Sequence, residues 1–349
     1  MPKLTLTEID MVRQKLDTAW KHEWEQQHER VKPFMTQVTD VAGEYYEVPY
    51  IGGTDMIEYT GSRVPMEESR LNYGKRGMRY RKFYNFITTS IDEIDDMMNL
   101  EMSWNLIREK QRPAVSRCVD MTALGVTKGT GGKYVLKTEE NDEGYMGGIL
   151  GTNYTGQGGL QKSNLVLTYP TAGGAFTNLI PVDYATTGTG VSTNFAGTLY
   201  DRIGYIKRKL AELDAFDSTS PGDICVAISP AEKQLLSAYE VGLNKDYGFS
   251  KLNETGATYN EFLNVTFIVT NMLPEMDTVD KAGAAVKGAR MCAAWLRSQV
   301  GFGTWRDAEW TLKDVPGMVE VDHGLRVRGK CGAMRFRDDA VFVLPVVQG

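Results

Sequence analysis

The chain has 349 residues, of which 42% are hydrophobic, so it is long enough to bury a substantial core in two or three lobes. Its formal net charge of -6 gives no overall basic field, which argues against tight, sequence-independent wrapping of nucleic acid. A surface that merely faces nucleic acid stays compatible with this charge.

The cysteines lie far apart and form no CxxC pair, which excludes zinc ribbons and disfavours a disulfide framework. We therefore expect buried, reduced thiols at Cys118, Cys225, Cys292 and Cys331. The N-terminus lacks the basic-then-apolar pattern of a signal peptide, and no apolar run approaches the length that crosses a bilayer. These features predict a cytoplasmically made protein that stays in solution.

The first segment is predicted to form an amphipathic helix from Leu6 to about Lys32. Its apolar residues, which include Trp20 and Trp24, recur at spacings of three and four, and Pro33 ends the pattern. Two tryptophans on an isolated helix need a surface to pack against. That surface belongs either to the same domain or to a neighbouring subunit.

The stretch from Glu44 to about Asn85 is rich in Tyr, Val, Ile and Arg, and predicts extended strands or a long hairpin. Turn signals occur at residues 51–54 and 72–74, and few of its side chains are suited to a core. Its charges form either a solvated face or, on a projecting hairpin, ion pairs with a neighbour. The candidates for such pairs are Arg63, Glu67, Glu68, Arg79 and Arg81.

A long helix is predicted from Ser90 to Leu124. Ser90 and Glu93 have the spacing of a capping box, and apolar residues then return at helical intervals. Pro113 removes one helical hydrogen bond and is expected to kink or interrupt the helix, while Gly125 is expected to stop it.

Residues 125–204 hold roughly half of the 36 glycines, which favours short strands and surface loops. A helical stripe of apolar residues follows from Leu199 to Phe216. Strands and a helix then alternate. Buried strands are predicted at residues 223–229, 265–270 and 291–296, with a helix that starts at Ser229-Pro230.

Long strands are predicted at the C-terminal end of the chain. Apolar residues such as Leu325 and Met334 alternate there with four arginines. Those arginines, expected on the polar side, are Arg326, Arg328, Arg335 and Arg337. A second strand follows at 341–344, with Pro345 typical of a sheet edge.

The sequence contains one run that superficially resembles a phosphate-binding loop, at residues 128–133. The required first glycine is replaced by Thr127, and Tyr134 stands where Ser or Thr is needed. A GxSxG nucleophile elbow is also absent. We therefore expect no catalytic residue and no cofactor site.

Metal sites need converging ligands, and the histidines His22, His28 and His323 are too dispersed to supply them. Asp92, Asp95 and Asp96 share one helical surface and could hold a hard cation. Acids at a helix start are, however, favoured by the helix dipole alone. We expect no metal site and no enzyme.

The order of these segments is similar to that of the major capsid protein of tailed bacteriophages, with the Hong Kong 97-type fold. The motifs that carry the resemblance are SIDEIDDMM at the helix start, DICVAISPAEKQLL at 223–236, FLNVTFIVTNMLP at 262–274, the strand AAW at 293–295 and the closing GAMR at 332–335. The resemblance extends from about residue 40 to the end of the chain. It matches less clearly at residues 129–198 and at the tryptophan helix.

The resemblance implies an α+β capsid fold with an N-terminal arm, an extended β-hairpin loop, a peripheral domain that contains the spine helix and long strands, and an α/β axial domain. The implied boundaries are 1–40 for the arm, 41–85 for the loop, 86–198 and 300–349 for the peripheral domain with spine helix 90–124, and 199–299 for the axial domain.

Such subunits assemble into pentamers and hexamers of an icosahedral shell in the host cytoplasm, usually around scaffolding protein. A portal and packaged double-stranded DNA are the further expected partners. Two alternatives remain open at this point. One is a cellular shell protein of the same fold that encloses a cargo enzyme, and the other is a β-rich binding protein or hydrolase.

Overall fold

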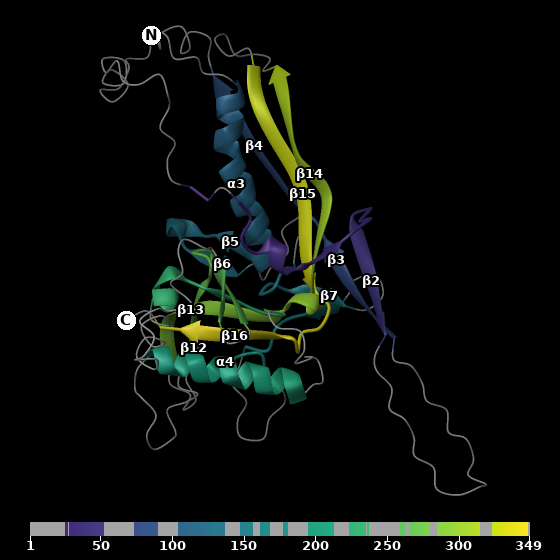
Figure 1. Cartoon of the computed structure of the whole chain (residues 1–349). Coiled ribbons are helices and arrows are strands. Elements are labelled where there is room, and N and C mark those ends of the chain that lie inside the picture. Colours follow the sequence, from purple (N-terminus) through teal and green to yellow (C-terminus); the bar gives the residue numbers. More distant parts are fainter. Residues whose placement is uncertain are drawn as a thin grey trace, which may run out of the picture. The chain divides into compact units, whose positions relative to one another are not determined.

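The computed structural model of this chain describes residues 25–26, 28–51, 73–89, 104–136, 147–155, 161–167, 177–180, 195–212, 223–234, 236, 259–262, 265–279, 285–314 and 323–347 (Figure 1). These residues fall into two compact units. The first comprises the described parts of 1–29, 82–119 and 306–330, and the second comprises those of 30–81, 120–305 and 331–349.

The first unit combines one long helix with extended strands. Its elements are α3 (Trp104–Leu124), β4 (Arg81–Thr89), β14 (Val300–Asp314) and β15 (His323–Arg335), each of which also has residues in the second unit. The strand order of the sheet is β1-β14-β15-β4. Within the unit, the α3 side chain of Gln111 donates to the Leu325 carbonyl at 3.2 Å.

Helix α3 confirms the C-terminal part of the predicted long helix. Of the two outcomes predicted for Pro113, a kink or an interruption, the interruption is wrong, because α3 runs through this residue. Proline lacks the N–H that would donate to the carbonyl of Glu109 in a regular helix, so one helical hydrogen bond is lost there. Gly125 ends the helix as expected, with a φ of 76°. The predicted start at Ser90 and Glu93 lies outside the described residues.

The second unit contains a six-stranded sheet in the order β10-β11-β9-β13-β12, with β16 also paired to β13. The strands are β9 (Ile224–Ile228), β10 (Tyr259–Phe262), β11 (Val265–Val269), β12 (Glu275–Val279), β13 (Ala285–Leu296) and β16 (Val341–Val346). Strands β9 and β11 are parallel, and every residue of β9 is buried. This explains why the apolar runs predicted there are continuous and do not alternate.

Helix α4 (Phe195–Glu212) lies along this sheet, beside β16 in the cartoon (Figure 1). It buries Ile203, Ile206 and Leu210, which are spaced by three and four residues, so the predicted helical stripe is confirmed. After β9, the chain is helical from Pro230 as predicted. The Glu232 carboxylate accepts the Ser229 N–H at 2.6 Å, in the manner of a capping box.

A second sheet has the order β2-β3-β7-β8, with strands β2 (Tyr45–Ile51), β3 (Tyr73–Arg79), β7 (Asn153–Thr155) and β8 (Gln161–Ser163). Strands β2 and β3 are antiparallel, which confirms the extended strands predicted after Glu44. The turn predicted at residues 72–74 is wrong in part, because Tyr73 and Gly74 begin β3. Met78 is fully buried, so it is one of the few side chains of this stretch that contribute to a core.

The chain enters the second unit through η1 (Lys32–Phe34) and β1 (Thr36–Val38), and β1 pairs in parallel with β14. The predicted N-terminal helix does not reach Lys32, because residues 28–31 are not helical. Arg30 and Val31 donate their backbone N–H groups to the Asp120 carboxylate, and Pro33 disfavours helix before it. Both interactions compete with helical hydrogen bonding.

The remaining short elements are β5 (Val126–Lys128), η2 (Thr130–Gly132), β6 (Tyr134–Leu136) and η5 (Arg297–Gln299). Cys225, Cys292 and Cys331 are buried, Cys118 is half-buried, and none of the four is in a disulfide. In the part of the chain that the structure describes, no helix is both long enough and apolar enough to span a membrane.

Candidate functional site

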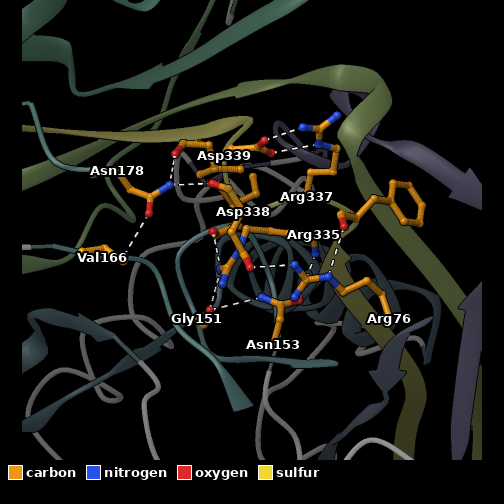
Figure 2. Close-up of polar contacts among 12 residues, drawn as sticks. Arg76, Gly151, Asn153, Val166, Asn178, Arg335, Arg337, Asp338 and Asp339 are labelled. Carbon is orange, nitrogen blue, oxygen red and sulfur yellow. Dashed lines mark hydrogen bonds and ion pairs between the residues drawn. The ribbon is translucent and has the colours of Figure 1, made fainter. Parts of the chain in front are cut away.

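A buried polar cluster is centred on Arg335, at the end of β15. Its side chain is fully buried, which corrects the expectation that this arginine lies on the polar side of the strand. Nη1 donates to the carbonyl oxygens of Gly151 at 2.6 Å and Ile149 at 2.8 Å, and Nε donates to Asp338 at 2.9 Å (Figure 2). The guanidinium therefore joins a turn, a strand and a following loop.

The turn that receives Arg335 also caps helix α3. The N–H groups of Ile149 and Leu150 donate to the carbonyls of Ala123 and Leu124, both at 2.9 Å. These carbonyls belong to the last turn of the helix and have no helical partner. The 147–151 turn therefore satisfies the helix end with its N–H groups and binds Arg335 with its carbonyl groups.

The turn requires glycine because two backbones meet directly. Gly148 has a φ of 85°, and a Cβ atom there would lie 2.4 Å from the Gly125 nitrogen. A Cβ atom on Gly125 would lie 2.4 Å from the carbonyl oxygen of Gly147. Side chains at these positions would separate the turn from the helix end.

Three further polar residues, Arg76, Asn153 and Asn178, complete the cluster around Arg335 and Asp338. We call these five residues the arginine junction. Asp338 accepts from Arg76 Nη2 at 2.7 Å, while Asn153 accepts the Arg335 backbone N–H at 2.9 Å (Figure 2). Asn178 donates to the carbonyl of Val341, at the start of β16, at 2.7 Å. The junction thus ties β3, β7, β15 and β16 together.

Arg335 keeps its positive charge although its burial disfavours that charge. Burial lowers the pKa of Arg335, and the Asp338 carboxylate opposes that shift. Because arginine starts from so high a pKa, it remains a cation at neutral pH. The carbonyl end of α3 carries a partial negative charge that also favours a cation nearby.

The chemistry available at the junction is structural. Its groups are guanidinium, carboxylate, amide and backbone, and direct hydrogen bonds link them to one another. Within the described ranges, no group of three or more His, Cys, Asp or Glu residues could hold a metal ion. The arrangement indicates a lock between chain segments.

A second polar anchor lies at Asp120, which is fully buried in the last turns of α3. Its carboxylate holds the backbone of Arg30, while Arg30 Nη1 donates to the carbonyl of Val269 at 3.1 Å. Nearby, the indole N–H of Trp295 donates to the carbonyl of Phe34 at 3.0 Å. The segment from residue 30 onward is therefore fixed to the second unit.

The structure describes two of the residues that the sequence predicted to form contacts between subunits. The Arg79 guanidinium lies 5.9 Å from the centroid of the Tyr45 ring, and Arg81 donates to the Val126 carbonyl at 3.4 Å. Burial raises the pKa of Tyr45, with Glu47 acting in the same direction and Arg79 opposing it. The other candidates, Trp20, Trp24, Arg63, Glu67 and Glu68, lie outside the described residues.

The run that resembles a phosphate loop connects two strands. Gly129 donates its N–H to the Lys133 carbonyl at 2.7 Å, and the hairpin β5–β6 forms around it. Lys133 makes an ion pair with Glu275 of β12 at 2.7 Å. Of the histidines, His28 is exposed, His22 lies outside the described residues, and His323 begins β15.

The sequence contained a signal for the buried position of Arg335 that a simple alternating pattern misses. Arg326 and Arg328 occupy even positions, whereas Arg335 shares the odd positions of Leu325 and Val327. In a regular strand, odd positions share one face, and Leu325 and Val327 are buried. The change of phase therefore marks Arg335 as an inward-facing residue. No comparable local signal identifies Asp120 or Asn178.

Comparison with solved structures identifies the fold. The capsid of the cyanophage P-SCSP1u matches with a TM-score of 0.59 and 12% identity, covering 99% of this chain and 96% of that one. The capsid of Myoviridae phage XM1 matches with a TM-score of 0.57 and 12% identity, covering 99% of this chain and 100% of that one. The capsid of Ralstonia phage GP4 matches with a TM-score of 0.59 and 9% identity, covering 96% of each chain.

These matches extend over nearly the whole of both chains, so they concern the complete fold. The predicted α+β capsid fold is therefore confirmed. No protein-family model and no curated protein matches the sequence.

Proposed function

We propose that this chain is a structural major capsid protein, which self-assembles into an icosahedral shell around phage DNA. The observation that carries the proposal is the end-to-end similarity in fold to phage capsid subunits, such as that of phage XM1, of which the chain covers 100%. A similarity of this extent leaves little of the chain for an additional catalytic domain. We accordingly propose a non-enzymatic role with no cofactor and no metal.

The proposal divides the chain by role. Residues 1–40 form an arm and 41–85 an extended loop, 86–198 and 300–349 form the peripheral domain, and 199–299 form the axial domain. The antiparallel pairing of β2 with β3 supports the proposed loop, because it places the two ends of the connecting segment side by side. The long helix α3 and the strands β14 and β15 support a peripheral domain that contains a spine helix and long strands.

Assembly would draw on many modest contacts. Interfaces of this kind reach stability by repetition across a closed symmetric lattice. We propose that Trp20 and Trp24 anchor the arm on another subunit or on scaffolding protein. Charged residues of the loop would pair across subunits, namely Arg63, Glu67, Glu68, Arg79 and Arg81. Pentamers and hexamers would form in the host cytoplasm, with scaffolding protein and a portal as partners.

The DNA contact would be non-specific. A chain with a net charge of -6 has no overall field that grips a polyanion, which suits a wall that must hold packaged DNA without binding it tightly. The mature product would be the capsid of the virion.

Electron microscopy of the purified, concentrated protein tests the proposal. Closed particles, or sheets of hexamers, are the expected result. A discrete monomer or small oligomer at every concentration and ionic strength, with and without co-expressed scaffolding protein, would contradict it. Particles purified from phage-infected cells should contain DNA; a protein cargo in place of DNA would support a cellular shell instead.

A further inference from the structure

The sheet of the first unit presents one exposed face that combines aromatic and basic side chains. On β4, the residues at even positions from Lys82 to Thr88 are exposed, whereas those at odd positions are half-buried. Tyr84 is 79% exposed and Phe86 is 40% exposed. Large side chains with this exposure on neighbouring positions of one strand are unusual for a surface that meets only water.

Neighbouring strand β15 contributes basic residues to the same face. A Cβ atom on Gly324 would lie 2.4 Å from the Phe86 ring, so Gly324 and Phe86 share a face. Gly329, at an odd position, instead faces the ring of Phe83. The half-buried residues at even positions of β15 therefore lie on the Phe86 face. These residues are Arg326, Arg328 and Lys330.

Strand β14 supplies the acids of this face. Glu309 forms an ion pair with Arg328 at 3.2 Å, which places Glu309 on the same face. By strand alternation Asp307 joins it. With Lys82, the basic residues outnumber these two carboxylates, so the face carries a net positive charge. The other side of the sheet meets α3 (Figure 1). On that side, the Arg108 guanidinium lies 4.8 Å from the Trp310 ring centroid.

The distribution of charge along the chain indicates what this face binds. In the described residues Lys and Arg outnumber Asp and Glu, although the whole chain has a net charge of -6. The acidic excess therefore belongs to the remaining sequence, which includes dense acidic runs at 92–96 and 139–143. A second copy of the chain thus offers abundant negative charge. Charge complementarity and exposed aromatic anchors are the usual components of a specific interface.

We propose that this aromatic–basic face, formed by Lys82, Tyr84, Phe86, Arg326, Arg328 and Lys330, binds an acidic surface of a second copy of the chain. The inference rests on the proposed shell function and names one of its interfaces. A nucleic acid is the less favoured occupant, because the net negative charge of the whole chain repels a polyanion at long range.

Two double variants test the proposal in the full-length chain. Arg326→Glu with Lys330→Glu reverses the charge of the face, and Tyr84→Ala with Phe86→Ala removes its aromatic anchors. Each should reduce the assembled fraction at least about tenfold at fixed protein concentration, measured by light scattering and electron microscopy. Circular dichroism should show the folded content of the wild type. If a charge reversal impairs folding, Arg326→Gln with Lys330→Gln replaces it.

Matched controls separate the face from net charge. Lys110→Glu with Lys287→Glu makes the same change in total charge at exposed positions on α3 and β13, and should assemble like the wild type. Exchanging the ion pair, by Glu309→Arg with Arg328→Glu, preserves the charge of the face and should retain most assembly. Equal loss in the Lys110/Lys287 variant would overturn the inference.

Zero-length carbodiimide cross-linking identifies the occupant. In a mixture of isotopically light and heavy protein, Lys82 or Lys330 should link to Asp or Glu of a differently labelled copy. Links only within one copy would overturn the proposal, as would loss of duplex-DNA binding with unchanged assembly in the face variants. Failure of the wild type itself to form particles would instead count against the proposed function.

Discussion

The carboxylate of Asp120 accepts the backbone N–H groups of both Arg30, at 2.9 Å, and Val31, at 3.0 Å. Asp120 lies near the C-terminal end of α3, where the helix dipole disfavours a negative charge. Two backbone donors offset that effect, because they satisfy a carboxylate that is completely buried. The contact fixes the point at which the N-terminal segment joins the second unit.

Replacing Asp120 by Ala is expected to destabilise the chain by about 2–4 kcal/mol, because two N–H groups would lose their acceptor in a buried site. Urea unfolding monitored by tryptophan fluorescence measures the change. Lys110→Ala, at an exposed position of the same helix, should change stability by less than about 0.5 kcal/mol. Trypsin should also cleave after Arg30 faster in the Asp120 variant. Unchanged cleavage would show that the anchor does not hold this segment.

The elements that the sequence predicted correctly are those whose signals are local. Helix α4 has an apolar stripe at helical spacing, and β9 and β11 are short apolar runs beside turn residues. Helix α3 continues through Pro113 without the interruption that was one of the two predicted outcomes, and this proline is buried, so tertiary packing offsets its local penalty. Local rules describe tendencies that long-range contacts can override.

The arginine junction could not be predicted as a site, because its members are distant in sequence. Arg76 and Asp338 are separated by more than two hundred residues, yet their side chains form an ion pair at 2.7 Å. Nothing near Arg76 in the sequence specifies this partner. The phase of alternation in β15 reveals that Arg335 points inward, but not which carbonyl groups it meets.

The glycine contact between the α3 end and the 147–151 turn predicts a strong dependence on residue size. Gly125→Ala and Gly148→Ala should each lower the free energy of unfolding by more than about 2 kcal/mol. Both positions have a positive φ and lie directly against another backbone segment. Thermal unfolding of purified variants provides the measurement. Gly204, at an exposed position of α4, is the matched control. A Cβ atom added there would have no neighbouring atom within 4 Å. Gly204→Ala should stabilise by about 0.5–1 kcal/mol.

Arg335→Lys should lower the free energy of unfolding by about 2 kcal/mol or more, although the charge is kept. A single ammonium group cannot reproduce the guanidinium hydrogen bonds to both Ile149 and Asp338. A double-mutant cycle with Asp338→Asn checks the interaction. We expect a coupling energy above about 1 kcal/mol. Additive effects would mean that the two side chains act independently.

The buried thiols should resist modification. Burial raises the pKa of Cys225 to about 12, so almost no thiolate forms at neutral pH. Burial also raises the pKa of Cys292. A colorimetric disulfide reagent at pH 8 should therefore react in the native protein only at half-buried Cys118, and Cys118→Ser should remove that reaction. Rapid native labelling of Cys225 would contradict the structure.

The surface ion pair between Lys133 and Glu275 predicts a small, pH-dependent stabilisation. The hydrogen bond from Lys133 holds the pKa of Glu275 below its usual range, and the Arg290 guanidinium, 3.5 Å from the Glu275 carboxylate, acts in the same direction. A carboxyl whose pKa is depressed in the folded state stabilises above the unfolded pKa, and this contribution is lost as the pH falls through the folded pKa. Because Lys133 is 70% exposed, Glu275→Gln should cost less than about 1 kcal/mol at pH 7.

The difference in unfolding free energy between wild type and Glu275→Gln should therefore be constant from pH 7 down to about pH 5, and then shrink toward zero at lower pH. Denaturant titrations at several pH values and low ionic strength measure it. Added salt should reduce the difference at pH 7, since exposed charges are screened. A difference that persists unchanged below the folded pKa would show that Glu275 stabilises through packing of its side chain, not through its charge.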